Sequence, residues 1–77
     1  MERFETEMRI KGILESLDLD ITGLQVGDDF STIIDWDSLK LINLVIALES
    51  EFSCTLDLAV YERLTSISSI VDVLILK

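Results

Sequence analysis

The residues of this chain with the clearest chemical potential are Asp37 and Ser38, which stand directly before a long apolar run. A serine hydroxyl becomes a good nucleophile when a base with a pKa near 7 removes its proton, and this sequence contains no histidine. Lys40 is the only nearby candidate base, so a hydrolase built on Ser38 and Asp37 is the weakest hypothesis. We therefore interpret Ser38 as a residue that another enzyme modifies.

Ser38 is predicted to open a long amphipathic helix. The buried face of that helix follows the i, i+3, i+4, i+7 spacing and consists of Leu41, Leu44, Val45, Leu48 and Phe52. The start of a helix offers unpaired N–H groups and the positive end of the macrodipole, which together stabilise a phosphate ester. Asp37 can cap the helix, or it can contact a metal ion or an arginine of the modifying enzyme. Ser38 could instead be a simple capping residue, and its position alone leaves that alternative open.

The same helix carries more apolar residues than one buried face requires. At about 100° per residue, the additional ones fall in a second sector that adjoins Ser38 and is bordered by Glu49. This second sector consists of Leu39, Ile42 and Ile46. An apolar patch beside a modifiable serine suits contact with enzymes, so we predict a docking face formed by these three residues and Glu49. The alternative is a helix buried on two sides of a small bundle.

Two further segments repeat the helical spacing. The first contains Ile10, Ile13, Leu14 and Leu17 and is expected to end near Asp18, and the last contains Ile67, Ile70, Val71 and Leu74, with Thr65 or Ser66 as N-cap. Residues 58–64 are long enough for one short helix. The sequence thus predicts an all-α fold, a small bundle of three main helices and a short one, with a long loop between the first and second helices.

The long connection spans residues 19–37 and is rich in Gly, Asp, Ser and Thr. Loops of this length without structure of their own are uncommon in compact domains and are often functional. We expect its apolar residues to pack across the helix ends; they are Leu24, Val26, Phe30, Ile33, Ile34 and Trp36.

Composition restricts the possible partners and the compartment. The chain has 77 residues, enough for one domain (1–77), and 15 acidic against 6 basic residues give a net charge of −9, which disfavours binding to nucleic acid and anionic membrane. Cys54 is the only cysteine, so no intramolecular disulfide can form, and we expect it to be an inert packing residue near a helix end. Without a signal-peptide pattern or an apolar run of membrane-spanning length, we expect a cytoplasmic monomer that does not insert into membranes.

The stretch from Trp36 to Phe52 resembles the signature of acyl carrier proteins, in which the serine of Asp-Ser-Leu accepts 4'-phosphopantetheine from coenzyme A. The similarity continues through Leu56 to Thr65-Ser66-Ile67 and covers most of the chain. The resemblance implies a carrier rather than an enzyme, with the arm on Ser38 and an acyl group held on its thiol as a thioester. It also implies two kinds of partner: a phosphopantetheinyl transferase that uses Mg²⁺, and acyl-loading or acyl-processing enzymes with basic patches.

Several departures from the family pattern indicate which subgroup of carrier proteins the chain resembles. Asp35 stands where the family usually has glycine, and Trp36 makes the motif Trp-Asp-Ser-Leu, which resembles stand-alone carriers of specialised pathways. Lys40 and Asn43 stand where fatty-acid carriers commonly have acids, which would leave Glu49 and Glu51 to supply electrostatic recognition. Fatty-acid, polyketide and related specialised pathways remain possible, as do an aminoacyl or peptidyl carrier and an unmodified acidic helical adaptor.

Overall fold

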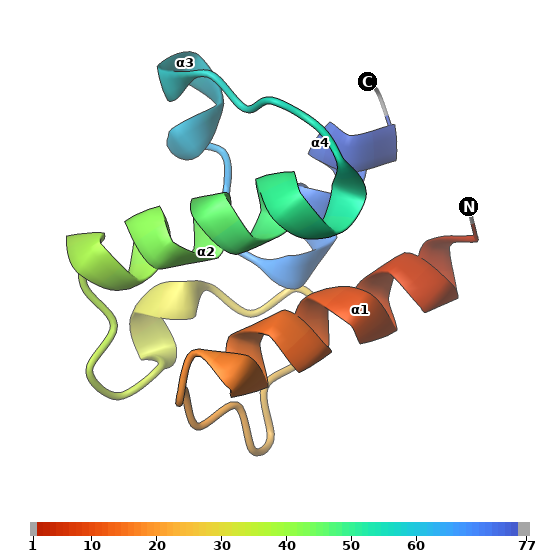
Figure 1. The fold of residues 1–77 in the computed structure, drawn as a ribbon. Helices are drawn as coiled ribbons and strands as arrows, with labels where there is room; N and C mark the ends of the chain where they lie inside the picture. The colour runs from red at the N-terminus through yellow and green to blue at the C-terminus, as the bar shows by residue number, and fades with distance from the viewer. Residues whose placement is uncertain (1, 76–77) are drawn as a thin grey trace.

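The computed structural model describes residues 2–75, and it is helical in the places where the sequence predicts helices (Figure 1). The elements are α1 (Arg3–Ser16), the 3₁₀ helix η1 (Phe30–Thr32), α2 (Ser38–Phe52), α3 (Leu58–Tyr61) and α4 (Ile67–Ile75). No strand occurs between residues 2 and 75, so the predicted all-α class is confirmed. Within the same range, no helix is both long enough and apolar enough to cross a membrane.

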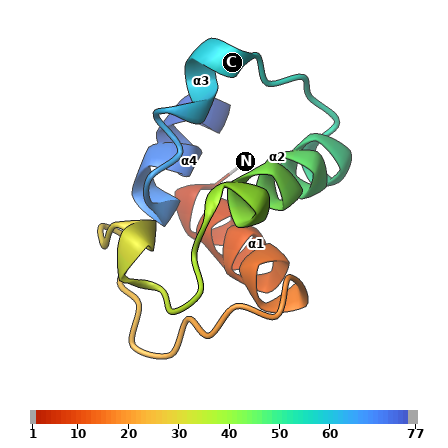
Figure 2. The ribbon, with the colours of Figure 1, turned by 90° about the vertical axis from the view of Figure 1, so that its left-hand side faces the viewer.

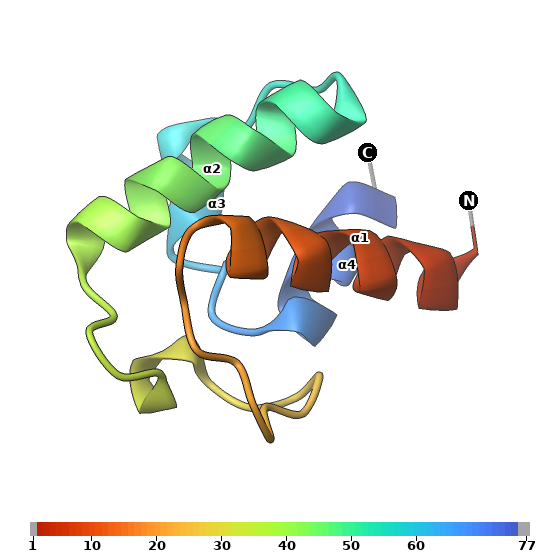
Figure 3. The ribbon, with the colours of Figure 1, turned by 60° about the horizontal axis from the view of Figure 1, so that its bottom comes forward.

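The first helix is the centre of the arrangement, because α1 contacts both α2 and α4. Figures 1 and 3 show that α2 begins at the opposite end of the molecule from the start of α1. The 3₁₀ helix η1 lies at the same end as the start of α2, and the segment after η1 leads directly into that helix. The fold therefore places the long connection beside Ser38.

The core draws on all three predicted helical stripes and on the connections between helices. Its most buried members are Ile10, Leu14, Phe30, Leu44, Val45, Leu48, Ile67, Ile70 and Val71. The outer members of the stripes, Leu17, Leu41, Phe52 and Leu74, are half-buried and pack against this cluster. Leu56 and Leu64 are buried on either side of α3, whose own four residues are not, so α3 is held mainly by its flanks.

The helix ends follow local hydrogen bonding. Asp18 has φ = 62°, a left-handed conformation that ends the helical path just after α1, as predicted. At α4, the Ser69 N–H donates to Ser66 Oγ (3.1 Å), and the Ser66 N–H donates in return to Ser69 Oγ (2.9 Å). This reciprocal pair is a capping box, which identifies Ser66 as the N-cap. The short helix α3 ends at Tyr61, three residues earlier than the predicted segment.

The long connection is tied to the start of α4 by its backbone. The Phe30 N–H donates to the Thr65 carbonyl (2.8 Å), and the Ser68 N–H donates to the Val26 carbonyl (2.7 Å). Phe30 and Ile33 are buried, which confirms that this segment packs its apolar residues inward. Ile34 is the exception, since 75% of its surface is exposed, and the prediction that it packs across the helix ends is wrong.

Ile34 is exposed because it lies in a tight turn. The Trp36 N–H donates to the Ile33 carbonyl (3.2 Å), and the residue between Ile34 and Trp36, Asp35, has φ = +68°. An i to i+3 hydrogen bond with positive φ at the third residue matches a type II β-turn, in which that position favours glycine. The glycine of the family pattern is therefore explained by backbone geometry, and Asp35 adopts a conformation that costs a non-glycine residue roughly 1 kcal/mol.

Replacement of Asp35 tests this backbone strain. We expect Asp35→Gly to raise the free energy of unfolding by about 0.5 kcal/mol, because relief of the strain exceeds the added entropy of the unfolded chain. Asp35→Val should lower it by about 1–2 kcal/mol, because a β-branched residue tolerates positive φ poorly. Urea denaturation at neutral pH measures both.

The matched control is Asp57→Gly. Asp57 has an ordinary φ of −87°, and its side chain makes no capping hydrogen bond. Glycine there should leave stability unchanged or slightly lowered. If glycine stabilised the chain equally at both positions, the positive φ of Asp35 would not be the cause.

Candidate functional site

Ser38 is the first residue of α2 and is exposed. The start of α2 lies at the end of the molecule that faces the viewer in Figure 2. The capping residue is Asp37, whose extended backbone (φ = −153°) precedes the helix and whose carboxylate Oδ1 accepts from the Lys40 N–H at 2.9 Å. The hypothesis that Ser38 is merely the cap is therefore wrong. Because Asp37 performs the capping, the Ser38 hydroxyl makes no hydrogen bond to any of residues 2–75.

The backbone around Ser38 suits a phosphate ester. The Asp37 carbonyl accepts from the Leu41 N–H (3.2 Å), which is the first regular hydrogen bond of the helix. Of the backbone donors that precede it, the Asp37 carboxylate satisfies that of Lys40. The N–H groups of Ser38 and Leu39 have no acceptor within the helix. A phosphate on Ser38 Oγ would lie next to these donors and at the positive end of a 15-residue helix. The residues present therefore fit the phosphate of a pantetheine arm.

The two faces of α2 have opposite environments. Leu44, Val45 and Leu48 are buried against the core, whereas the second sector is open to solvent: Leu39 is 62% exposed, Ile42 47% and Ile46 60%. The alternative of a helix buried on two sides is wrong. The three side chains of this sector form an apolar patch that begins immediately beside Ser38.

Glu49 borders the patch but also has a structural contact. Its carboxylate Oε2 accepts from the Leu56 N–H at 2.8 Å, and Leu56 is buried after the turn that follows α2. Glu49 therefore fixes the path of the chain into α3. Its predicted contribution to docking stays a prediction.

Glu51 is engaged in a contact between α1 and α2. The Arg9 guanidinium hydrogen-bonds to Glu51 Oε2 (2.9 Å) and to the Glu51 carbonyl (3.0 Å), and it lies 4.5 Å from the centre of the Phe52 ring. With Glu49 bonded to backbone and Glu51 paired with Arg9, the acids expected to supply electrostatic recognition are already occupied within the fold.

Two other residues singled out from the sequence have packing roles. The Trp36 ring contacts the buried Phe30 ring, with centroids 5.0 Å apart and planes at 41°, so Trp36 anchors the loop that precedes Ser38. Cys54 is half-buried just after the end of α2, where it packs against the core. Both observations agree with the sequence-based interpretation of these residues.

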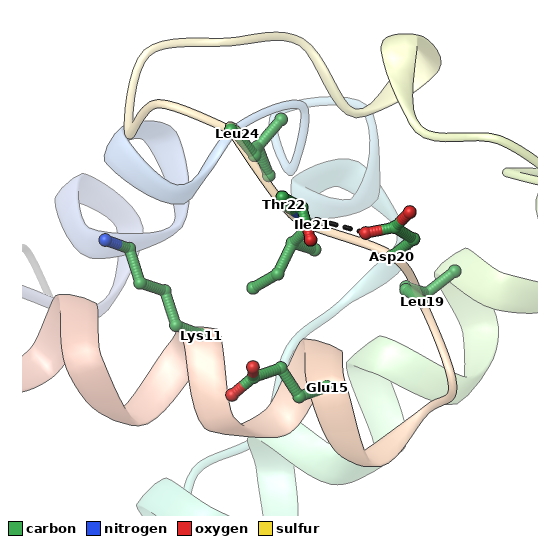
Figure 4. A pocket seen from close by; sticks show the side chains of 8 residues that line it. Lys11, Glu15, Leu19, Asp20, Ile21, Thr22 and Leu24 are labelled. Carbon is green, nitrogen blue, oxygen red and sulfur yellow. Dashed lines mark hydrogen bonds between the residues drawn. The ribbon is translucent and has the colours of Figure 1, made fainter.

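A surface pocket of about 350 Å³ lies between α1 and the connection that follows it (Figure 4). Its lining consists of Lys11, Glu15, Leu19, Asp20, Ile21, Thr22, Gly23 and Leu24. The Thr22 backbone N–H (3.0 Å) and its side chain hydrogen-bond to Asp20 and hold the pKa of that carboxyl below its usual value. None of the predicted site residues lines this pocket, so it is separate from the Ser38 site.

One exposed residue close to Ser38 in the sequence was not predicted to be part of the site. Ile34 lies four residues before Ser38 at the turn described above, and it is more exposed than any apolar residue of the α2 patch. The replacement of the family glycine by Asp35 marks that turn in the sequence. A turn pattern at residues 33–36 would have indicated that one of the two adjacent isoleucines faces solvent.

Comparison with known proteins agrees with this geometry. Residues 9–74 match the family model described as "Phosphopantetheine attachment site". The chain is 32% identical over 73 residues to the acyl carrier protein of Petrotoga mobilis, an alignment that covers 95% of this chain and 84% of that protein.

A small helical fold with an exposed serine at the start of α2, together with these matches, defines the class of phosphopantetheine-dependent carrier proteins. The chain belongs to the acyl carrier protein family. Its prosthetic group is 4'-phosphopantetheine, and it is a carrier rather than an enzyme. The subdivision into a stand-alone Trp-Asp-Ser-Leu type stays a prediction.

The contact between Glu49 and Leu56 gives a test of the structural role of Glu49. We expect Glu49→Ala to lower the free energy of unfolding by about 1–2 kcal/mol, because the Leu56 N–H loses a charged acceptor. Glu49→Gln retains an acceptor oxygen and should recover part of this loss. Amide hydrogen exchange at Leu56, measured by NMR, should accelerate in Glu49→Ala and much less in Glu49→Gln. Equal acceleration in both variants would show that the charge, and not the hydrogen bond, fixes the loop.

Proposed function

We propose that Ser38 is the attachment point of the 4'-phosphopantetheine arm, and that the chain presents acyl intermediates on that arm to partner enzymes. The observation that carries this proposal is the division of tasks at the start of α2. Asp37 caps the helix through Lys40, so the neighbouring Ser38 hydroxyl is exposed and has no structural hydrogen bond to lose. When bound, the arm supplies a thiol that holds an acyl group as a thioester.

In the loading step, the chain positions the Ser38 hydroxyl, and the transferase activates it. Ser38 presents its oxygen on a rigid helix end, and the N–H groups of Ser38 and Leu39 lie where a phosphate would need donors. No histidine is present in the sequence to accept the hydroxyl proton, so a base of the transferase must take it. Asp37 uses Oδ1 for the cap, and its second oxygen can still contact Mg²⁺ or an arginine of that enzyme.

Docking is assigned to the apolar patch of Leu39, Ile42 and Ile46, with Glu49 at its border. Between Ser38 and Glu49 the only charged residue of α2 is Lys40, so close contact on this face is mainly apolar. The net charge of −9 steers the chain over longer distances toward enzymes with basic patches. Tethering then makes each later reaction effectively intramolecular and raises the effective concentration of the cargo.

The partners proposed are a phosphopantetheinyl transferase and the enzymes that load and process the acyl group. A fatty-acid, polyketide or related specialised pathway fits a carrier of this kind, and an aminoacyl or peptidyl carrier is the second candidate. Asp37 favours an acyl carrier over a peptidyl one, because peptidyl carriers more often have histidine before the serine. We further propose that residues 1–77 act as a single domain and as a cytoplasmic monomer, consistent with the unpaired Cys54.

Loading with coenzyme A tests the attachment site. Incubated with coenzyme A, Mg²⁺ and a broad-specificity transferase, the wild-type chain should gain the mass of one arm, and Ser38→Ala should gain none. Ser50→Ala is the matched control, because Ser50 is also an exposed serine of α2 and should load normally. Intact-mass spectrometry with peptide mapping measures the outcome. An unmodified wild-type chain would favour the adaptor hypothesis, and an arm on another residue would refute the assignment to Ser38.

Asp37 can be tested for two separate roles. Asp37→Ala removes the cap and should lower the free energy of unfolding by about 1 kcal/mol, whereas Asp37→Asn keeps a capping oxygen and should lower it by much less. If the carboxylate also contacts the transferase or its Mg²⁺, both variants should load at least tenfold more slowly. Loading of Asp37→Asn at the wild-type rate would show that Asp37 acts only as a cap.

A further inference from the structure

We infer that Ile34 is a recognition residue for the transferase that loads Ser38, and that it inserts into an apolar hollow beside that enzyme's active site. This inference rests on the proposed attachment at Ser38. It concerns a side chain outside α2, the helix that carries the predicted docking face.

The first observation is the high solvent exposure of the Ile34 side chain. Its neighbour Ile33 is buried (5% exposed), and Trp36 packs on Phe30, so both flanks of the turn are anchored in the core. Ile34 between them is 75% exposed. Turns are usually formed by Gly, Pro, Asn, Asp and Ser, and nothing in the fold requires an isoleucine at this place.

The second observation is the location of the turn. Residues 33–37 lead directly into the start of α2 (Figure 2). In the sequence, the exposed residues Ile34 and Leu39 stand before and after Ser38. Exposed apolar side chains therefore stand on both sides of the serine in the sequence. An enzyme that covers Ser38 closely meets apolar surface from both segments.

The transferase is the partner that must make this close approach. Its reaction takes place at Ser38 Oγ, so its active site has to enclose that atom, align it with the phosphate and exclude water. Enzymes that act on the acyl group work at the far end of the arm. The residues that immediately flank Ser38 are thus best placed to distinguish the loading enzyme from the later ones.

The same turn indicates the chemistry of the transferase surface that would contact it. Asp35, next to Ile34, is exposed, and no hydrogen bond or ion pair joins its side chain to the rest of residues 2–75. The matching surface on the transferase is an apolar hollow for Ile34 with a basic side chain facing Asp35. Because Ile33 and Trp36 anchor the turn in the core, less entropy should be lost when these groups are bound.

Loading kinetics of Ile34→Ser test the inference. With a transferase that loads the wild-type chain, KM for the apo-carrier should rise about tenfold, as expected when one covered apolar side chain is lost, while kcat changes little. Ile34→Leu should restore most of the affinity. Circular dichroism and urea denaturation of each variant establish that the fold is retained, which the exposure of Ile34 leads us to expect.

The matched control is Phe4→Ser. Phe4 is similarly exposed (69%) but lies at the start of α1, the opposite end of the molecule from Ser38 (Figures 1 and 3). Its KM should equal that of the wild type. A wild-type KM for Ile34→Ser would overturn the inference and leave the attachment site intact. Failure of the wild-type chain to load would instead refute the proposed function, so the two failures are distinguishable.

Discussion

The hydrogen bond from the Lys40 N–H to the Asp37 carboxylate is the contact on which the functional end of this molecule depends. It caps α2 so that the helix starts at Ser38, and the carboxylate of Asp37, not the serine hydroxyl, accepts the hydrogen bond from the Lys40 N–H. Ser38 can then be both ordered, as the first residue of a helix, and unbonded at its oxygen. This combination suits the proposed attachment of the arm at Ser38, because the hydroxyl has no hydrogen bond within residues 2–75 that modification would break.

The distribution of charge follows from the way the helices are joined. Arg3 bonds to Asp72 and Ser68 on α4, and Arg9 bonds to Glu51 on α2, so both arginines of α1 are used inside the fold. Exposed pairs of this kind contribute only about 0–1 kcal/mol each, so their main effect is on which charges remain for partners. Near the end of α2, Glu49 and Glu51 form contacts within the fold. Asp35, which precedes Ser38, is exposed. The proposed recognition near the serine would therefore combine a local apolar surface with the long-range attraction of a strongly acidic chain.

Periodicity and capping chemistry predicted most of the fold from the sequence. The helical stripes, the all-α class and the open second face of α2 depend on local spacing, and the structure shows all three. The contact of Glu49 with Leu56 and that of Arg9 with Glu51 and Phe52 could not be predicted in this way, because each joins residues whose separation is set by tertiary packing. The pattern of apolar and polar residues could not show which of Ile33 and Ile34 faces inward, because that depends on the turn from Ile33 to Trp36.

That turn contains two features that are unfavourable for stability. Asp35 has a positive φ that glycine would adopt more easily, and Ile34 leaves a large apolar side chain in water. Natural sequences depart from local rules most often at functional sites, where another requirement outweighs stability. Here the departures are adjacent to each other and stand a few residues before Ser38, the proposed attachment point, while the flanking Ile33 and Trp36 follow the rules and pack inward. Glycine at position 35 would relieve the strain but would also remove a carboxylate from beside Ile34. Under the inference drawn for this turn, stability and recognition by the loading enzyme would therefore favour different residues at this position.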